Sequence, residues 1–399
     1  MPHKLRRTRS VFRKRRVPPA VKVLGSIVLC LGVMAGGFFT AKWITENQKG
    51  PSDTETIQPL TPSPSNKPGG NTAPPNGDKE DVVTPGDNTP DTPASFASLR
   101  GFYLPFSALQ SDALPATLSA AHKAGFNAVL FDLKDADGNL YYQFSTPEAK
   151  KIGYATDSLT AEELTALFDL MRENGLQPIP RLYAFRDDVA CAKLTDARIS
   201  YVENHSWAWY DGEKAKGAKK WLNPYSATAQ GYIQGLAEEL KNQGAAAVML
   251  EGVQFPDKLT AKAYLGDTAA TVSKSDALAA FVAATRTRLG ADCPLLLGCT
   301  EKGALATDTK IYGGNPLTFG AGIVSPLLSS KWKESTEKMV HRIQGPDIKG
   351  TSLAPMLKVD GLTASKVNEA ISGTVNGGTT GFILYADDGK YDFAAYDLP

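Results

Sequence analysis

From residue 98 onward, short apolar runs alternate with longer segments whose apolar residues recur every three or four positions. A short continuous apolar run is typical of a strand buried on both faces, and the longer spacing is typical of an amphipathic helix. The alternation therefore predicts parallel βα units. We expect eight strands, at residues 101–105, 128–133, 177–185, 246–251, 294–298, 321–325, 352–357 and 380–386.

Helical patterns lie between most of these strands. One begins after Thr160, which together with Glu163 three residues later has the sequence of a capping box. Gly244 and Gly290 are typical stop signals for two of the helices. The other expected helices span residues 114–124, 227–242, 275–289, 331–342 and 363–371.

The number of strands and the length of the segment decide between two α/β architectures. Eight strands in about 300 residues fit a closed (β/α)8 barrel, which uses about 250 residues. An open doubly wound sheet would have a glycine-rich phosphate loop after its first strand. Leu104-Pro-Phe-Ser has no glycine. We therefore expect a TIM-like barrel over residues 98–399.

The N-terminal region has a different pattern. Nineteen uncharged residues lie between Lys22 and Lys42, close to the roughly 20 apolar residues that span a bilayer. We expect a transmembrane helix at 23–45, or alternatively a cleaved signal peptide ending near Ala35-Gly-Gly. Residues 1–22 hold nine Lys or Arg and no acid. Such a tail stays cytoplasmic, so the barrel is expected outside the cell. The barrel would be attached to the cell membrane by a single transmembrane helix or, if the signal is cleaved, secreted.

Residues 46–97 have the composition of a disordered linker. They hold ten of the 26 prolines and no aromatic residue before Phe96. Such a segment buries too little apolar surface to offset its ordering entropy, and its prolines favour an extended spacer. The net charge of +1 comes from the basic tail, because the rest of the chain is acidic. We therefore expect a membrane contact through residues 23–45 and no nucleic-acid partner.

Cysteine and histidine usage indicates no metal site and no cofactor. There is no Cys-x-x-Cys pair and no Cys/His spacing typical of zinc. Outside the apolar N-terminal run, Cys191, Cys293 and Cys299 remain. They allow one disulfide that includes Cys191, or three buried thiols.

Functional residues of a (β/α)8 barrel lie just past the carboxyl ends of its strands. The most informative case is Val248-Met-Leu-Glu251, an apolar run that ends in a carboxylate. A charge that ends a buried strand is costly unless it has a purpose. Gln254 follows the same strand, and equivalent positions of the other strands hold Asp132, Lys134, Asp135, Arg181, Tyr183, Glu301, Asp360 and Tyr385.

This set is rich in acids and aromatic residues and poor in histidine, which suits carbohydrate better than metal. Hydrolysis of a glycosidic bond needs two carboxyl groups. We expect Glu251 to be one, with Glu301 or Asp360 as its partner. The residues expected to bind the substrate are Asp132, Lys134, Asp135, Arg181, Tyr183, Trp221, Gln254 and Tyr385. Aromatic rings that could stack on sugar faces are Trp207, Trp209, Trp221 and Tyr225.

Three sequence blocks resemble those of a bacterial family of glycoside hydrolase-like domains with a TIM-barrel fold. Residues 129–138 (VLFDLKDADG) are similar to its Val-Asp-x-Lys-Asp-x-x-Gly block, and residues 180–187 (PRLYAFRD) to its Arg-x-x-x-Phe-x-Asp block. Residues 221–226 (WLNPYS), followed by 245–256, resemble its Trp-x-Asp-Pro-Tyr and Phe-Asp-Tyr-x-Arg-Phe-Pro blocks. The resemblance implies a barrel that acts on a polysaccharide.

The sequence also departs from the family's pattern. Its Asp at the end of the fourth strand is Glu251 here, and its following Tyr and Arg are Gly252 and Gln254. The Asp of the family's Trp-x-Asp-Pro block is Asn223 in this chain. The family's Tyr-Pro-Ser-type sequence after the sixth strand is replaced by Ser325-Pro-Leu-Leu-Ser. An aspartate-to-glutamate change moves the carboxylate outward by one methylene, and a misplacement of about 1 Å can cost roughly 10²-fold in rate.

Three functions remain open on the sequence. The first is a membrane-anchored extracellular glycoside hydrolase that acts on a cell-envelope or exported polysaccharide. The second is a catalytically inactive barrel that binds such a glycan, which the altered fourth-strand block favours. The third is a structural envelope protein whose partner binds the linker or the outside of the barrel. A pair of carboxylates across a cleft favours hydrolysis, whereas Glu251 held by a basic residue favours binding.

Overall fold

The computed structural model describes residues 96–329, 334–345 and 351–399 of the 399-residue chain. The predicted transmembrane helix at 23–45, the basic tail 1–22 and all but the end of the predicted linker lie outside these residues. Among the residues described, no helix is both long enough and apolar enough to cross a membrane.

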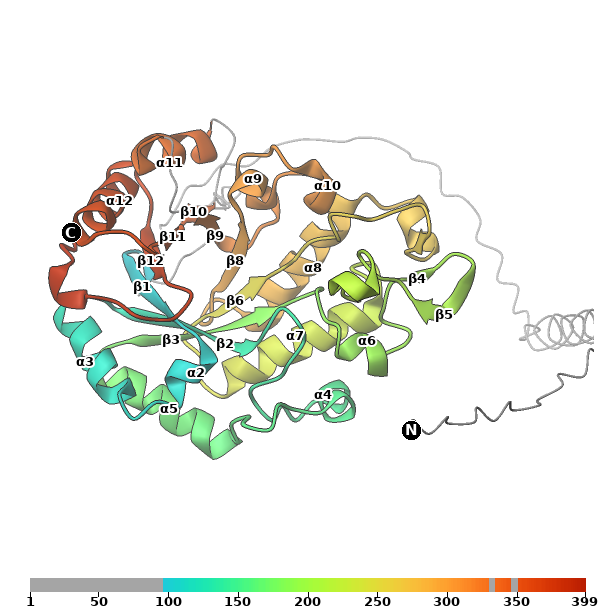
Figure 1. Cartoon of the computed structure of the whole chain (residues 1–399), viewed down its shortest axis with the longest axis horizontal. Coiled ribbons are helices and arrows are strands. Elements are labelled where there is room, and N and C mark those ends of the chain that lie inside the picture. Colours follow the sequence, from blue (N-terminus) through green and yellow to red (C-terminus); the bar gives the residue numbers. More distant parts are fainter. Residues whose placement is uncertain (1–95, 330–333, 346–350) are drawn as a thin grey trace, which may run out of the picture. The chain divides into compact units, whose positions relative to one another are not determined.

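The strands form a closed parallel barrel, as the sequence predicts (Figure 1). Parallel pairing runs from β1 through β2, β3, β6, β8, β9, β11 and β12, and β12 pairs again with β1. The bounds are β1 (Leu99–Leu104), β2 (Ala128–Lys134), β3 (Gln177–Tyr183), β6 (Val248–Glu251), β8 (Leu295–Thr300), β9 (Gly322–Leu328), β10 (Ser352–Leu353), β11 (Met356–Lys358) and β12 (Gly381–Tyr385).

The seventh strand differs from the expected run 352–357, because it is divided into β10 and β11. Pro355 lies in the gap and has no N–H to donate to a neighbouring strand. Both pieces pair with β9, and β11 also pairs with β12. The barrel therefore stays closed across the interruption.

Helices cover the outside of the barrel (Figure 1). They are α3 (Leu114–Lys123), α5 (Ala161–Glu173), α7 (Ala227–Asn242), α8 (Lys274–Leu289), α11 (Thr336–Gln344) and α12 (Ala364–Asn376). The Thr160–Glu163 capping box is present at the start of α5. α11 begins at Thr336, after the Ser335 cap, and so later than the expected residue 331.

Short elements connect these units. They are α2 (Phe106–Leu109), α4 (Pro147–Ile152), α6 (Ala190–Lys193), α9 (Glu301–Ala304), α10 (Thr309–Tyr312) and the 3₁₀ turns η2 (Lys214–Lys216), η3 (Asp267–Ala270), η4 (Pro316–Thr318) and η5 (Phe393–Ala395). A separate antiparallel sheet has the order β5 (Asn204–Ala208), β4 (Ser200–Tyr201), β7 (Ala263–Tyr264). Two long loops, after β3 and after β6, supply this sheet, which the sequence pattern does not predict.

Two separate apolar cores hold the domain together. One fills the interior of the barrel with side chains such as Leu130, Ile179, Met249, Leu296 and Ile383, and the other lies between strands and helices. Each fully buried side chain of this size stabilises the fold by about 1.5–3 kcal/mol relative to exposure. The apolar filling stops near the carboxyl ends of the strands, where polar residues take the inward-facing positions.

The seam between the first and last strands is close-packed. Leu99 of β1 pairs with Gly381 of β12. A Cβ atom at residue 381 would lie 2.0 Å from the carbonyl oxygen of Leu99, so only glycine fits there. Arg100 also donates to the carbonyl of Pro399 at 2.9 Å, which ties the end of the chain to β1.

The cysteines Cys191, Cys293 and Cys299 are all buried and free. Of the two alternatives that the sequence leaves open, the structure has the buried thiols. Burial raises the pKa of Cys293 to about 11 and that of Cys299 further. These thiols are therefore protonated at neutral pH and fill space in the core.

Candidate functional site

Arg181 lies at the centre of the barrel mouth, between two carboxylates. Its side chain, from β3, is 2% exposed. Nε and Nη2 donate to the Asp132 carboxylate of β2 at 2.5 and 3.1 Å. Nη1 donates to Oε2 of Glu251, at the end of β6, at 2.6 Å. One guanidinium thus bridges an acid of β2 and an acid of β6, the strands on either side of β3.

Three tyrosines surround the guanidinium. The rings of Tyr103, Tyr183 and Tyr385 have their centroids 4.6, 5.1 and 5.3 Å from Cζ of Arg181. Tyr103 and Tyr385 stack with centroids 4.4 Å apart, and the Tyr103 hydroxyl donates to Asp132 at 2.7 Å. We call Asp132, Arg181, Glu251, Tyr103 and Tyr385 the arginine cluster.

The electrostatics of the arginine cluster favour the ion pairs. Burial alone would lower the pKa of Arg181, but the charges of Glu251 and Asp132 outweigh it and raise that pKa well above its usual value. Burial raises the pKa of Tyr103, and the adjacent Asp132 charge raises it further. The tyrosine therefore stays a neutral donor, and the arginine stays charged.

A small cavity, here called the mouth cavity, opens beside Glu251. Its volume is about 110 Å³, and its lining includes Tyr183, Arg186, Trp221, Glu251 and Gln254. A water occupies about 30 Å³ of liquid, and cavities that enclose ligands usually measure about 300–1,000 Å³. The mouth cavity thus has room for a few waters or for one edge of a ligand, and it does not enclose a sugar ring.

Lys134 and Asp187 form a fully buried ion pair next to the arginine cluster. Lys134 Nζ lies 2.9 Å from Asp187 Oδ2 and donates to the carbonyl of Tyr183 at 2.6 Å. Both side chains are 0% exposed. The pair connects β2 to the loop after β3 and supports the backbone that carries Tyr183. Contact of Lys134 with a ligand stays a prediction, and its complete burial weighs against it.

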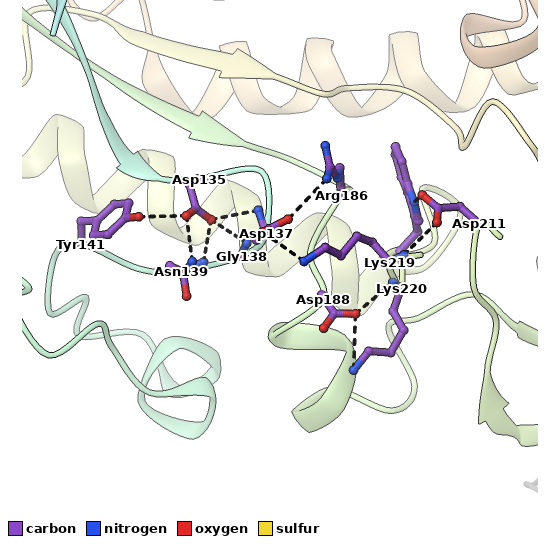
Figure 2. Close-up of polar contacts among 11 residues, drawn as sticks. Asp135, Asp137, Gly138, Asn139, Tyr141, Arg186, Asp188, Asp211, Lys219 and Lys220 are labelled. Carbon is purple, nitrogen blue, oxygen red and sulfur yellow. Dashed lines mark hydrogen bonds and ion pairs between the residues drawn. The ribbon is translucent and has the colours of Figure 1, made fainter. Parts of the chain in front are cut away.

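Asp135 organises the loop that follows β2. Its carboxylate accepts hydrogen bonds from the backbone N–H groups of residues 137, 138 and 139, each at 2.9 Å (Figure 2). It also accepts from the side chains of Asn139 and Tyr141, each at 2.8 Å. These bonds outweigh partial burial and lower its pKa. A substrate contact for Asp135 stays a prediction beside this structural role.

The two expected partners of Glu251 are held by backbone groups of the adjacent loops, after β9 and after β12. Glu301 begins α9 and accepts from the backbone N–H of Ser329 at 3.2 Å. Asp360 accepts from the backbone N–H of Asp387 at 2.9 Å and lies 3.8 Å from Lys358. Within the part of the chain that is described, neither acid is hydrogen-bonded to the arginine cluster. Their catalytic roles stay predictions.

Gln254 and Trp221 lie at the edge of the mouth cavity. Oε1 of Gln254 accepts from the Tyr312 hydroxyl at 3.2 Å. Trp221 is 5% exposed, and its indole N–H donates to Asp211 at 2.9 Å. Trp209 is buried and Tyr225 half-buried, whereas Trp207 lies exposed on β5. Trp221 and Trp209 are therefore mainly packing residues.

Two departures from the family's pattern have a local structural reason. Gly252 has φ +67°, a conformation that a tyrosine adopts only with strain, and a Cβ there would lie 3.3 Å from Tyr183. Nδ2 of Asn223 donates to the carbonyl of Leu265 at 2.9 Å. An aspartate could not make that bond, because its carboxylate has no N–H. Both changes suit the conformation of the neighbouring loops.

Two residues of the site were not predicted from the sequence. Tyr103 lies near the end of β1 and could have been found by the rule that selected Asp132 and Arg181. Asp187 is the last residue of the 180–187 block, but nothing in the sequence shows that it pairs with Lys134. The available signal was Lys134, a charged residue at the end of an apolar strand, which would need an acidic partner if it were buried.

The comparisons with solved structures give weak likenesses. A hypothetical protein from Ruminiclostridium thermocellum ATCC 27405 is 23% identical with a TM-score of 0.42, covering 49% of this chain and 96% of the other. An inactive mutant of an exo-β-N-acetylglucosaminidase from Vibrio harveyi is 13% identical with a TM-score of 0.49, covering 75% and 51%. A catalytic module of the pneumococcal exo-β-D-N-acetylglucosaminidase is 12% identical with a TM-score of 0.49, covering 75% of this chain and 81% of the other. Likenesses of this size say nothing about activity.

No curated protein gives a significant match to the sequence. A family model described as "Putative glycosyl hydrolase domain" matches residues 101–297. The match runs from β1 to β8 and includes Asp132, Arg181 and Glu251. This agrees with the resemblance of the three sequence blocks and with the closed parallel barrel. Residues 101–297 therefore belong to the family of glycosyl hydrolase-like domains that this model describes.

Proposed function

We propose that this glycoside hydrolase-like barrel binds a glycan of the cell envelope at the carboxyl ends of its strands and does not cleave it. The observation that carries the proposal is the position of Arg181 between Asp132 and Glu251. Hydrolysis needs one carboxyl group that gives a proton and another that attacks or activates water across the scissile bond. Here the space between the two acids is filled by a guanidinium, which donates to both.

The other acids of the mouth support the same reading. Glu301 and Asp360 accept hydrogen bonds from backbone N–H groups of their own side of the barrel. A group held in this way is well suited to maintaining loop structure. The half-buried rings of Tyr183 and Tyr385 and the free oxygen of Glu251 remain available to contact sugar hydroxyls, which are both donors and acceptors.

Hydrolysis is the second candidate, and a specific observation favours it. Only one oxygen of Glu251 is used by Arg181, and Glu251 also lines the mouth cavity. Its second oxygen, Oε1, is not engaged by any hydrogen bond among the residues described. That oxygen could act on a bond at the cavity. Catalytic hydrogen bonds can also tighten only when substrate is bound.

One experiment separates the two candidates. The full chain and its Glu251→Gln variant are incubated with purified insoluble cell-wall glycan, and both released reducing ends and sedimented protein are measured. Binding without cleavage predicts no release by either protein and nearly equal retention. Hydrolysis predicts release by the wild type and a loss of about 10²-fold or more in the variant. Glu173→Gln, an exposed change at the end of α5, is the matched control.

We also propose that residues 23–45 anchor the chain in the cell membrane with the barrel outside. The nineteen uncharged residues and the basic flank 1–22 support this proposal. An anchor of this kind would present the barrel to the glycan of the envelope. If the segment is instead a cleaved signal, the barrel is secreted and reaches the same class of ligand.

A further inference from the structure

A larger cavity, here called the side cavity, lies next to the mouth cavity. Its volume is about 600 Å³, which falls within the roughly 300–1,000 Å³ of ligand sites. Its lining includes Asp211, Ala218, Trp221, Gln254, Asp257 and Lys258. These residues come from the loops after β3 and β6. The side cavity therefore lies to one side of the barrel axis.

The two cavities are adjacent because they share walls. Trp221 and Gln254 line both of them. Gln254 is three residues beyond Glu251, and its loop leads from the end of β6 toward Asp257 and Lys258. The mouth cavity and the side cavity together form one polar groove, which begins at Glu251 and widens away from it.

One wall of the groove is built rigidly. Asp211 accepts from the indole N–H of Trp221 at 2.9 Å and from the backbone N–H of Lys219 at 2.7 Å. Lys219 reaches Asp137 of the β2 loop at 3.0 Å, and the backbone N–H of residue 220 donates to Asp188 at 3.0 Å (Figure 2). Segment 219–221 is thus fixed to the loops after β2 and β3, and the wall is in place before a ligand binds.

The lining residues from the loop after β6 present polar groups without protein partners in the described part of the chain. Oε1 of Gln254 is taken by Tyr312, and no other described residue uses its amide N–H₂ group. Asp257 and Lys258 are exposed, and neither makes an ion pair or side-chain hydrogen bond with the described part of the chain. The groove therefore offers donors and acceptors along its length, which is the pattern that sugar hydroxyls can satisfy.

We propose that this groove binds a glycan chain of several sugar units, with one unit in the side cavity and the chain crossing Gln254 toward Glu251. This inference rests on the proposed glycan-binding function and specifies its ligand as a chain and not a single sugar. The mouth cavity alone is too small to enclose a ring, whereas the side cavity is large enough. Gln254 lies at the junction, so its amide is placed to bind the link between two units.

The test measures affinity against chain length. Calorimetry or fluorescence titration of the full chain uses N-acetylglucosamine oligomers of one, two, four and six units, and soluble peptidoglycan glycan strands. Ala218→Trp fills the side cavity without touching the mouth cavity. The double variant Asp257→Ala/Lys258→Ala removes two exposed charges from the groove and should fold normally. It therefore tests the groove even if Ala218→Trp fails to fold. Lys123→Ala/Glu173→Ala, at exposed helix ends outside the groove, is the matched control.

We expect the four-unit oligomer to bind the wild type and the control about tenfold or more tightly than the single sugar. Either groove variant should lose most of that gain while its affinity for the single sugar changes little. Equal affinity for one and four units overturns the chain-binding groove but leaves glycan binding intact. The chain-binding groove is also overturned if both groove variants bind oligomers of every length as tightly as the wild type does. Failure of the wild type to bind any oligomer or strand overturns the proposed function itself.

Discussion

Replacing Arg181 by methionine should destabilise the barrel more than any other single change in the mouth. Methionine keeps the unbranched stem and removes the guanidinium. Asp132 and Glu251 would then face each other with no positive charge between them, at 8% exposure for Asp132 and 16% for the Glu251 side chain. Breaking a buried ion pair by removing one partner usually costs about 3–5 kcal/mol. Since Arg181 serves two acids and packs on three tyrosines, we expect the upper half of that range.

This loss is large but measurable. A domain has a free energy of unfolding of about 5–15 kcal/mol, so the variant should still fold. With a urea m-value of about 3 kcal/mol/M, the midpoint should fall by roughly 1.3–1.7 M. The assay is urea denaturation of the full chain at pH 7, followed by the near-ultraviolet circular dichroism of the packed tyrosines. The midpoint of the exposed variant Arg288→Met should move by less than a third as much.

A compensated variant tests the reasoning behind the magnitude. In Asp132→Asn/Arg181→Met/Glu251→Gln, no charge is left without a partner, so at least half of the lost stability should return. Arg181→Met alone should also gain stability as the pH falls, because protonation of one of the two facing carboxylates removes the repulsion between them. A loss below about 1 kcal/mol, or a triple variant no more stable than Arg181→Met, would refute the argument that charge balance holds the mouth together.

Three further predictions concern other parts of the chain. Because the pKa of Asp135 is lowered in the folded state, its contribution to stability is complete at neutral pH and is lost as the pH falls below about 4; Asp135→Asn should flatten a plot of melting temperature against pH over that window. Gly138→Ala should cost about 3 kcal/mol more than Gly153→Ala in urea denaturation, because its Cβ would lie 1.9 Å from the buried Asp187 carboxylate, whereas residue 153 has open space; equal costs would contradict this. The full chain should stay in the membrane pellet after an alkaline wash, and deletion of residues 1–45 should release it; a wild type found in the supernatant would argue against the anchor.

The sequence predicts the barrel well because burial on both faces leaves a clear pattern. All eight expected strands overlap an observed one, and α7 has the expected bounds. The short antiparallel sheet was missed because β4 and β7 have two residues each and β5 is largely exposed, so none of them shows an apolar run. The division of the seventh strand at Pro355 was also not predicted, because the residues on both sides of the proline are apolar.

The site was predictable in position but not in pairing. Asp132, Arg181, Glu251 and Tyr385 meet because the carboxyl ends of parallel strands converge at one end of a barrel. That Arg181 takes both carboxylates depends on distances around the barrel, which a linear sequence does not contain. Glu301 and Asp360 follow their strands equally well, yet their loops direct them to backbone N–H groups.

The seam between β1 and β12 has a consequence for how the chain is made. Leu99 and Gly381 are direct neighbours in the barrel although almost the whole domain separates them in sequence. During synthesis, β1 therefore has an unpaired edge until the last strand leaves the ribosome. Contacts between such distant residues form slowly, and an open strand edge invites pairing with other chains. A truncated or stalled product that lacks β12 would keep that edge open and would be a natural target for chaperones and proteases.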